Sequence, residues 1–206
     1  MTVVFTDRTK DDSGLKRTEE LINKGLGGAG AHIDELGFLS LNLSDKQLAG
    51  LTEEQRNFYD VLNNANTDSR GDVNINLVAG DHEVPIASWL TNTIDIQDVE
   101  KFGEKRAGAD EFSVFGHEVR EEQASQLDKK TIADGMTYLR DHKEGIKAEE
   151  KIKDNKRLGD ESSTHLDPRG GKTGVSTFQY KDNKTGKITT VTVIYIAGNV
   201  ASVDNN

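Results

Sequence analysis

The chain has 206 residues, 33% of them hydrophobic and 30% charged, which is enough for one domain but lies at the polar end for a globular protein. It contains no cysteine. This excludes disulfides, thiolate metal sites and a cysteine nucleophile, so any metal ion must be bound by histidine and carboxylate groups. No apolar run approaches the roughly 20 residues of a membrane span, and no secretory signal is recognisable at the N-terminus.

The net charge of −10 is unevenly distributed along the chain. Residues 1–100 carry 18 acidic and 8 basic side chains, which leaves 18 of each for residues 101–206. An acidic surface repels phosphate backbones, so nucleic acid is not expected as a partner. The same surface would suit a protein that masks a basic toxin. A non-catalytic acidic binding or immunity protein is therefore one alternative to an enzyme.

Residues 1–43 are predicted to form a lead-in. An extended segment over residues 1–12 precedes a short helix over residues 13–24, and the glycine-rich run Gly25–Gly30 follows. A phosphate-binding glycine loop would follow a strand and open a helix. This run comes after a helix instead, so a connector is favoured over a phosphate site.

Residues 44–157 are the predicted catalytic core. Ser44 is a good helix cap with Gln47 three residues later, and apolar residues at near-helical spacing predict one amphipathic helix to about Asn66. Alternating or short apolar runs then predict strand-like pieces. These pieces are Gly71–Val78, Val84–Leu90 and Ile94–Ile96.

Two consecutive helices are predicted next, over residues 110–127 and 132–153, with Gly135 and Gly145 as weak points of the second. Residues 154–174 are polar and contain turn-forming pairs, which predicts a loop. A hairpin is predicted to follow, and the final segment, residues 158–206, thus holds a polar loop and a C-terminal β-hairpin. Its strands are Val175–Tyr180 and Lys187–Ile196. The predicted fold class is α+β, with a small antiparallel or mixed sheet packed against the two helices.

The run His117-Glu-Val-Arg-Glu121 lies on the first of these helices. At 100° per residue, His117 and Glu121 project about 40° apart, so both can reach one ion, while Glu118 lies where it could hold a water molecule. This is the familiar H-E-x-x-H zinc motif with a glutamate in place of its second histidine. The opposite side of the helix is apolar, with Phe112, Phe115 and Val119. The alternative is that these glutamates line a solvated face beside an incidental histidine.

A third ligand is expected on the second helix. His142 is the first choice and Glu149, seven residues later and nearly on the same face, is the second; if His142 binds, Glu149 could lie behind it and orient its imidazole. Together with His117 and Glu121, this set predicts one zinc ion with an open position for water. The predicted chemistry is amide-bond hydrolysis with Glu118 as the base. Tyr138, one turn before His142, either stabilises an oxyanion or only packs.

The remaining candidates are weaker. His82 and His165 are predicted to be loop residues rather than ligands, and a nuclease centred on His82 lacks a basic groove. Ser162 and Ser163 lack the context of a nucleophile elbow, which disfavours a serine hydrolase. A nuclease toxin that uses His117, nearby carboxylates and magnesium stays open as an alternative.

Several of these segments together resemble a known family. Residues 58–157, about half of the chain, are similar to the C-terminal toxin domains of bacterial polymorphic (RHS-type) proteins, which look like zincin metallopeptidases with an HExxE or HExxH helix. The similarity is carried by Val73–Val78, Ile94–Asp98, Phe115–Gln123 and Asp141–Glu150. The resemblance implies metal ligands at His117, Glu121 and His142, and a general base at Glu118.

The same resemblance also implies a biological setting. It suggests a secreted bacterial effector that is cytoplasmic before export and is delivered into another cell by a route without a signal peptide. Its expected substrate is a protein or peptide. Its expected partners are a cognate immunity protein or a component of a secretion system, with no membrane association.

Overall fold

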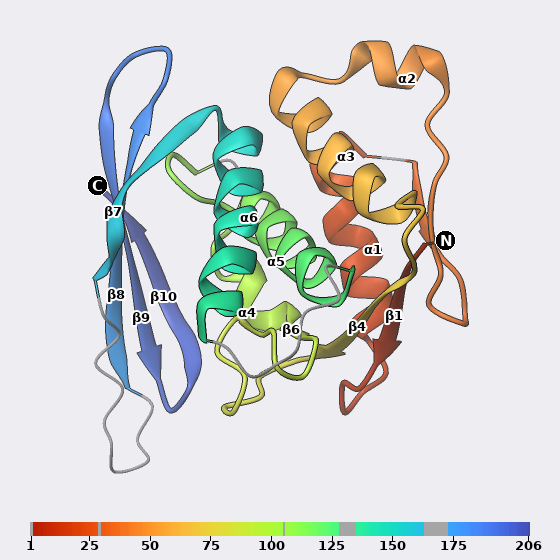
Figure 1. The fold of residues 1–206 in the computed structure, drawn as a ribbon, viewed down its shortest axis with the longest axis horizontal. Coiled ribbons are helices and arrows are strands. Elements are labelled where there is room, and N and C mark those ends of the chain that lie inside the picture. Colours follow the sequence, from red (N-terminus) through yellow and green to blue (C-terminus); the bar gives the residue numbers. More distant parts are fainter. Residues whose placement is uncertain (1, 29, 105, 128–134, 163–172) are drawn as a thin grey trace.

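The computed structural model describes residues 2–28, 30–104, 106–127, 135–162 and 173–206 (Figure 1). Six helices and ten strands occur in these ranges, and the fold class is α+β, as predicted. A mixed sheet with α1 and α3 lies at one end of the long axis, α5 and α6 occupy the middle, and an antiparallel sheet lies at the other end (Figure 1). The N- and C-termini are at opposite ends of this arrangement.

The first sheet is mixed. Its strands lie in the order β1 (Val3–Asp7), β4 (Val73–Val78), β6 (Thr93–Asp95) and β5 (Ala87–Ser88); the first three are parallel and β5 is antiparallel to β6. The predicted strand at 71–78 is confirmed as β4. The predicted strand at 94–96 is wrong at its end, because Ile96 begins α4 (Ile96–Glu100). The Asp95 carboxylate caps that helix by accepting the backbone N–H of Gln97 and Asp98.

The N-terminal segment contributes to this sheet. Strand β1 pairs with β4 along its whole length, and its Val3 and Phe5 side chains are buried. The predicted helix is confirmed as α1 (Gly14–Gly25), and the connector leads to the hairpin of β2 (Ala31–Ile33) and β3 (Leu39–Leu41). Residues 1–12 therefore include a core strand, although they precede every motif that the sequence offers.

The single helix predicted from Ser44 to about Asn66 is two helices in the structure. Ser44 and Gln47 form the predicted capping box, but α2 (Asp45–Gly50) ends when Leu51 takes an extended conformation. A second capping box, Thr52 with Gln55, starts α3 (Glu53–Asn66). The apolar spacing continues across this break, and it cannot reveal that the backbone turns there.

Helix α5 (Glu111–Leu127) is the centre of the fold, and α6 (Gly135–Lys153) packs along it. The structure confirms both predicted helices. The predicted apolar side of α5 is buried, but Ser113, Val114 and His117 on other sides are buried as well. Helix α5 thus contacts α1, α3, α4, α6 and β4, and most of its polar face is buried as well.

The C-terminal sheet is larger than the predicted hairpin. Strands β8 (Gly174–Asp182) and β9 (Ile188–Ile196) are that hairpin, and β10 (Asn199–Asn205) and β7 (Asn155–Ser162) flank them in the order β10-β9-β8-β7. The loop predicted at 154–174 is wrong over residues 155–162, which form β7. Charged side chains are usual on such an edge strand and conceal it from apolar patterning. Residues 163–172 of that prediction, with Ser163 and His165, lie outside the described residues.

A single apolar cluster extends through all three predicted segments, from Val3 to Val203. The boundaries at residues 43 and 157 stay a prediction from sequence. None of the helices in the described ranges has both the length and the apolar composition that a membrane span requires.

The buried carboxyl group of Glu111 should make the stability of this core depend on pH. Its side chain lies in the first turn of α5 and is 4% exposed, and burial raises its pKa from the ordinary 4.5 to about 7. The folded state therefore holds this proton more tightly than the unfolded state, and stability falls as the pH rises from about 4.5 through 7. We expect Glu111→Gln to stabilise the protein at pH 8 by on the order of 2 kcal/mol, or about 4–8 °C in Tm.

Thermal unfolding of both proteins at pH 4.5, 6 and 8 measures this effect. The increase in Tm of Glu111→Gln over wild type should be smaller at pH 4.5, where the wild-type carboxyl is protonated in the folded state. The exposed Glu20→Gln should show no such trend. An equal Tm for wild type and Glu111→Gln at pH 8 would contradict the prediction.

Candidate metal centre

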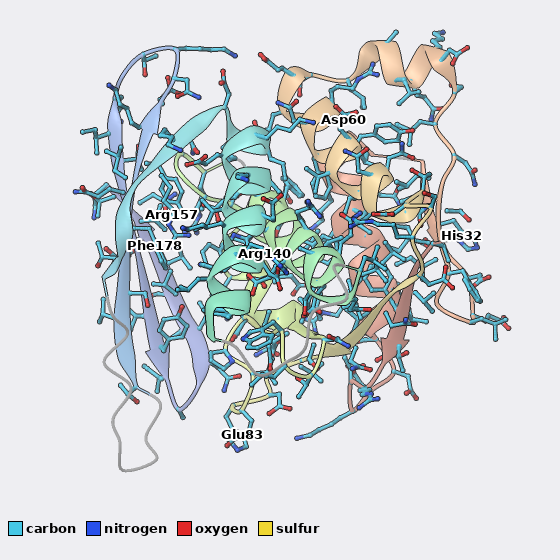
Figure 2. The ribbon with its side chains drawn as sticks, viewed as in Figure 1. His32, Asp60, Glu83, Arg140, Arg157 and Phe178 are labelled. Atoms are coloured by element: carbon cyan, nitrogen blue, oxygen red, sulfur yellow. The ribbon has the colours of Figure 1, made fainter. Side chains whose placement is uncertain are left out.

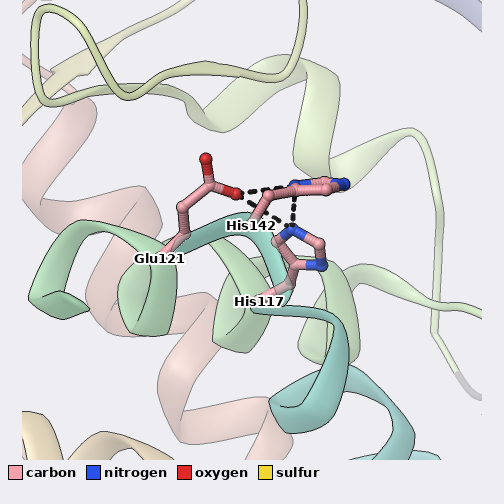
Figure 3. Close-up of side chains that lie close together, drawn as sticks. All are labelled: His117, Glu121 and His142. Atoms are coloured by element: carbon pink, nitrogen blue, oxygen red, sulfur yellow. Dashed lines mark hydrogen bonds and ion pairs between the residues drawn. The ribbon is translucent and has the colours of Figure 1, made fainter. Parts of the chain in front are cut away.

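Three predicted ligands converge between α5 and α6 (Figure 3). His117 and Glu121 come from α5, and His142 comes from α6. His117 Nε2 is 3.2 Å from Glu121 Oε2 and 3.2 Å from His142 Nδ1, and His142 Nδ1 is 2.8 Å from Glu121 Oε2. These three residues form a cluster that could hold a metal ion.

Protons alone do not satisfy this triangle of atoms. Each ring nitrogen carries at most one hydrogen and the ionised carboxylate carries none. If both nitrogens are protonated, two N–H groups face each other along the Nε2–Nδ1 edge. If either is unprotonated, its lone pair faces the carboxylate oxygen. A single cation among the three atoms interacts favourably with all three lone pairs.

The spacing also suits an ion. In a tetrahedral zinc site with bonds of about 2.0–2.1 Å, neighbouring ligand atoms are about 3.3 Å apart. The three separations here are 2.8, 3.2 and 3.2 Å, so a point at that bond length from all three atoms exists. The donor set of two imidazoles and one carboxylate therefore fits a transition metal in both chemistry and size.

Burial removes the solvated-face alternative for this helix. His117 and Glu121 are each 5% exposed, and Glu122 is 1% exposed. Burial raises the pKa of Glu122 to about 9, so this neighbouring carboxyl is neutral at pH 7. Only Glu118 and Arg120, among the residues of the motif, are partly exposed.

Glu149 approaches His117 from the other side. Its Oε2 is 3.0 Å from Nδ1 of His117. Burial opposes a charge on His117, but hydrogen bonds with Glu121 and Glu149 raise its pKa to about 10. Against the effect of burial, the same contacts lower the pKa of Glu121 to about 2 and that of Glu149 below its ordinary value. An ion would replace the proton at Nε2 and leave Nδ1–H donating to Glu149.

The prediction that Glu149 orients the His142 imidazole is wrong, because its carboxylate contacts Nδ1 of His117 instead. Glu149 orients the His117 ring, and His142 is the third member of the cluster. The sequence predicts both side chains on one face of α6. In the structure His142 lies next to Nε2 of His117, whereas Glu149 lies next to Nδ1 of the same ring.

Gly145 determines how closely the helices meet at this site. A Cβ atom at position 145 would lie 2.6 Å from His117 Cδ2 and 3.0 Å from the His117 carbonyl oxygen. No side chain fits there without moving one helix. The sequence predicted Gly145 only as a weak point of α6, whereas it is the position that lets α6 pass over the histidine.

A small cavity adjoins the cluster. Its volume is about 70 Å³, and His117, Glu118 and His142 line it together with side chains of the C-terminal sheet. Figure 2 shows two of these, Arg157 and Phe178, on the sheet beside α6. The Arg157 guanidinium carbon lies 4.4 Å from the centre of the Phe178 ring. The sequence did not predict that the C-terminal sheet forms a wall of this site.

Tyr138 lies beside the cluster with its ring against a ligand. Its centroid is 5.4 Å from that of His142, with 18° between the planes. Tyr138 also stacks with Trp89, at 5.5 Å and 29°. The residues that line the 70 Å³ cavity do not include Tyr138. The packing alternative for this residue is therefore observed, and the oxyanion role stays a prediction.

His82 is separate from this site. Its side chain is 70% exposed in the loop after β4, 3.6 Å from Glu83. Glu83 lies at the outer rim of the molecule (Figure 2). The prediction that His82 is a loop residue is confirmed.

Comparisons with protein-family models, with curated proteins and with solved structures gave no match to this chain. The resemblance to zincin-like toxin domains therefore stays a prediction from its motifs.

Proposed function

We propose that this chain is a zinc-dependent metallopeptidase. One observation carries the proposal: the convergence of His117, Glu121 and His142 beside a cavity that Glu118 also lines. Three protein ligands, an adjoining space for water and a carboxylate on that space are the parts that metal-assisted hydrolysis requires.

The donor set favours zinc over magnesium. Magnesium prefers oxygen ligands, whereas two of these three donors are imidazole nitrogens. This also disfavours the magnesium-dependent nuclease. Ferrous iron in oxygenases uses two histidines and one carboxylate as well. A further carboxylate beside the ligands supports hydrolysis, because water activation needs a base and oxygen activation does not.

A divalent ion held at this site would polarise a carbonyl group and lower the pKa of a water molecule bound to it towards about 7. Glu118 would accept the proton of the attacking water as its oxygen bonds to the amide carbon. The C–N bond then breaks, and Glu118 returns the proton to the departing nitrogen. Glu149 would keep the His117 ring in place throughout by accepting its Nδ1–H.

The substrate and setting rest on the resemblance. A protein or peptide substrate, delivery as a bacterial effector or toxin, and an immunity or secretion-system partner all follow from the likeness to polymorphic toxin domains. A cavity of about 70 Å³ admits water and a carbonyl group but no large side chain. Specificity would therefore come from surfaces outside it.

The direct test combines metal content with hydrolysis. The purified protein should contain about one zinc per chain by elemental analysis. It should cleave members of a peptide library, detected by mass spectrometry, and a zinc chelator should abolish cleavage. His117→Ala should lose both the ion and the activity. His82→Ala, at an exposed histidine, is the matched control and should keep both.

Three results would overturn the proposal. Zinc-loaded protein that cleaves nothing in the library, or stoichiometric iron in place of zinc, excludes a zinc peptidase. Metal-free protein that binds a basic protein tightly supports the acidic binding protein instead.

A further inference from the structure

The two imidazoles of the cluster are held in different ways. Glu149 orients His117 through a hydrogen bond to the nitrogen that faces away from the cluster. Metal-binding histidines usually have such a partner. For His142 the equivalent atom is Nε2, and none of the residues within the described ranges forms a hydrogen bond with it. Something else must fix the plane of this ring.

An aromatic ring is stacked on the His142 imidazole. The imidazole of His142 lies nearly parallel to the Tyr138 ring, at 18° and 5.4 Å, and Tyr138 in turn stacks with Trp89, so that the three rings form a column. Tyr138 and His142 are four residues apart on α6, so both lie on one face of the helix. Trp89 comes from a different element, the loop between β5 and β6.

That loop is firmly anchored. The backbone N–H of Asn76 in β4 donates to the Asn92 carbonyl oxygen at 2.7 Å, and the Asn76 side-chain amide donates to the Thr91 carbonyl oxygen at 2.8 Å. Ile86 and Asn92, on either side of Trp89, have φ of 65° and 50°. Non-glycine residues keep such conformations only where their surroundings impose them. Trp89 is therefore a fixed support for the column.

We propose that Trp89 and Tyr138 are positioning residues, whose stacked rings hold the His142 imidazole in the plane that metal binding requires. The inference rests on the ion site of the proposed function, but it does not depend on the reaction performed there. It assigns a role to a loop that contributes no residue to the metal-binding cluster, and it gives Tyr138 a function that its ring performs without its hydroxyl.

Variants that remove an aromatic ring, compared with variants that keep one, distinguish a positioning role from other roles of these residues. Trp89→Leu and Tyr138→Leu should each raise the Kd for zinc about tenfold, measured by competition with a chromogenic chelator. Trp89→Phe and Tyr138→Phe keep a ring and should stay within about threefold of wild type. Leu90→Ala, an exposed neighbour in the same loop, is the control. Circular dichroism verifies that each variant is folded, and either leucine variant suffices for the comparison.

Two spectra report the ligand geometry directly. The visible absorption of the cobalt-loaded protein should change in the leucine variants and not in the phenylalanine variants. Trp89 is the single tryptophan of the chain, so wild-type fluorescence should respond when zinc is added.

The outcomes distinguish this proposal from the catalytic one. Zinc affinity and cobalt spectra unchanged in both leucine variants, even with a lower Tm, would show that the column is merely structural. Wild type that binds zinc without hydrolysing peptides overturns the peptidase and leaves positioning intact. Wild type that binds neither ion overturns both.

Discussion

Glu118→Gln is expected to lower kcat/KM for peptide hydrolysis by about 10²–10⁴-fold while zinc stays bound, because glutamine has the same size but cannot accept a proton. Glu118 lines the cavity beside His117 and His142 without belonging to the metal-binding cluster. Glu118→Gln should therefore lower peptide hydrolysis without lowering zinc binding. The measurements are steady-state kinetics on a peptide found in the library and the zinc content of the same preparation.

The control for this variant is Glu53→Gln, at a glutamate whose side chain is 66% exposed and far along the chain from the site. It should keep full activity. Glu118→Gln with wild-type kcat/KM would exclude Glu118 as the base, whereas a variant that also loses its zinc would mean that Glu118 supports the ion.

The sequence predicts well what depends on local geometry. Helical periodicity is enough to place His117 and Glu121 on one face, because four residues advance a helix by little more than one turn. The capping box at Ser44 is equally local. The choice between His142 and Glu149 as the third ligand cannot be made from local geometry. It depends on the register and separation of α5 and α6, which Gly145 sets through its contact with His117.

Other elements could not be predicted from sequence patterns because they are stabilised by partners that are distant in the sequence. The charged strand β7 is stabilised by its neighbour β8 and shows little apolar alternation of its own. Strand β1 belongs to the core only because it pairs with β4, seventy residues later. Trp89 lies 49 residues before Tyr138, and only the folded chain brings their rings together. The parts of the site that the sequence missed are those contributed by distant elements.

Glu121 is the position at which this site departs from the common histidine motif, and substitutions there should have a graded effect. Its Oε2 is the carboxylate oxygen nearest to His117 Nε2 and His142 Nδ1. Glu121→Ala removes a ligand and should weaken zinc binding by at least about 10²-fold, since even loss of an outer partner costs 10- to 100-fold. Glu121→Gln keeps the shape without the charge and should fall between alanine and wild type.

Glu121→His is the informative member of the series, because it restores the second histidine. It should bind zinc within about tenfold of wild type, and the neutral ligand leaves the ion more positive, which favours water ionisation. We therefore expect equal or higher kcat at neutral pH. The matched control is Glu20→Ala, at an exposed glutamate that also pairs with a residue four positions away on a helix. Unaltered zinc affinity in Glu121→Ala would remove Glu121 from the ligand set and leave His117 and His142 alone too few to hold a catalytic ion.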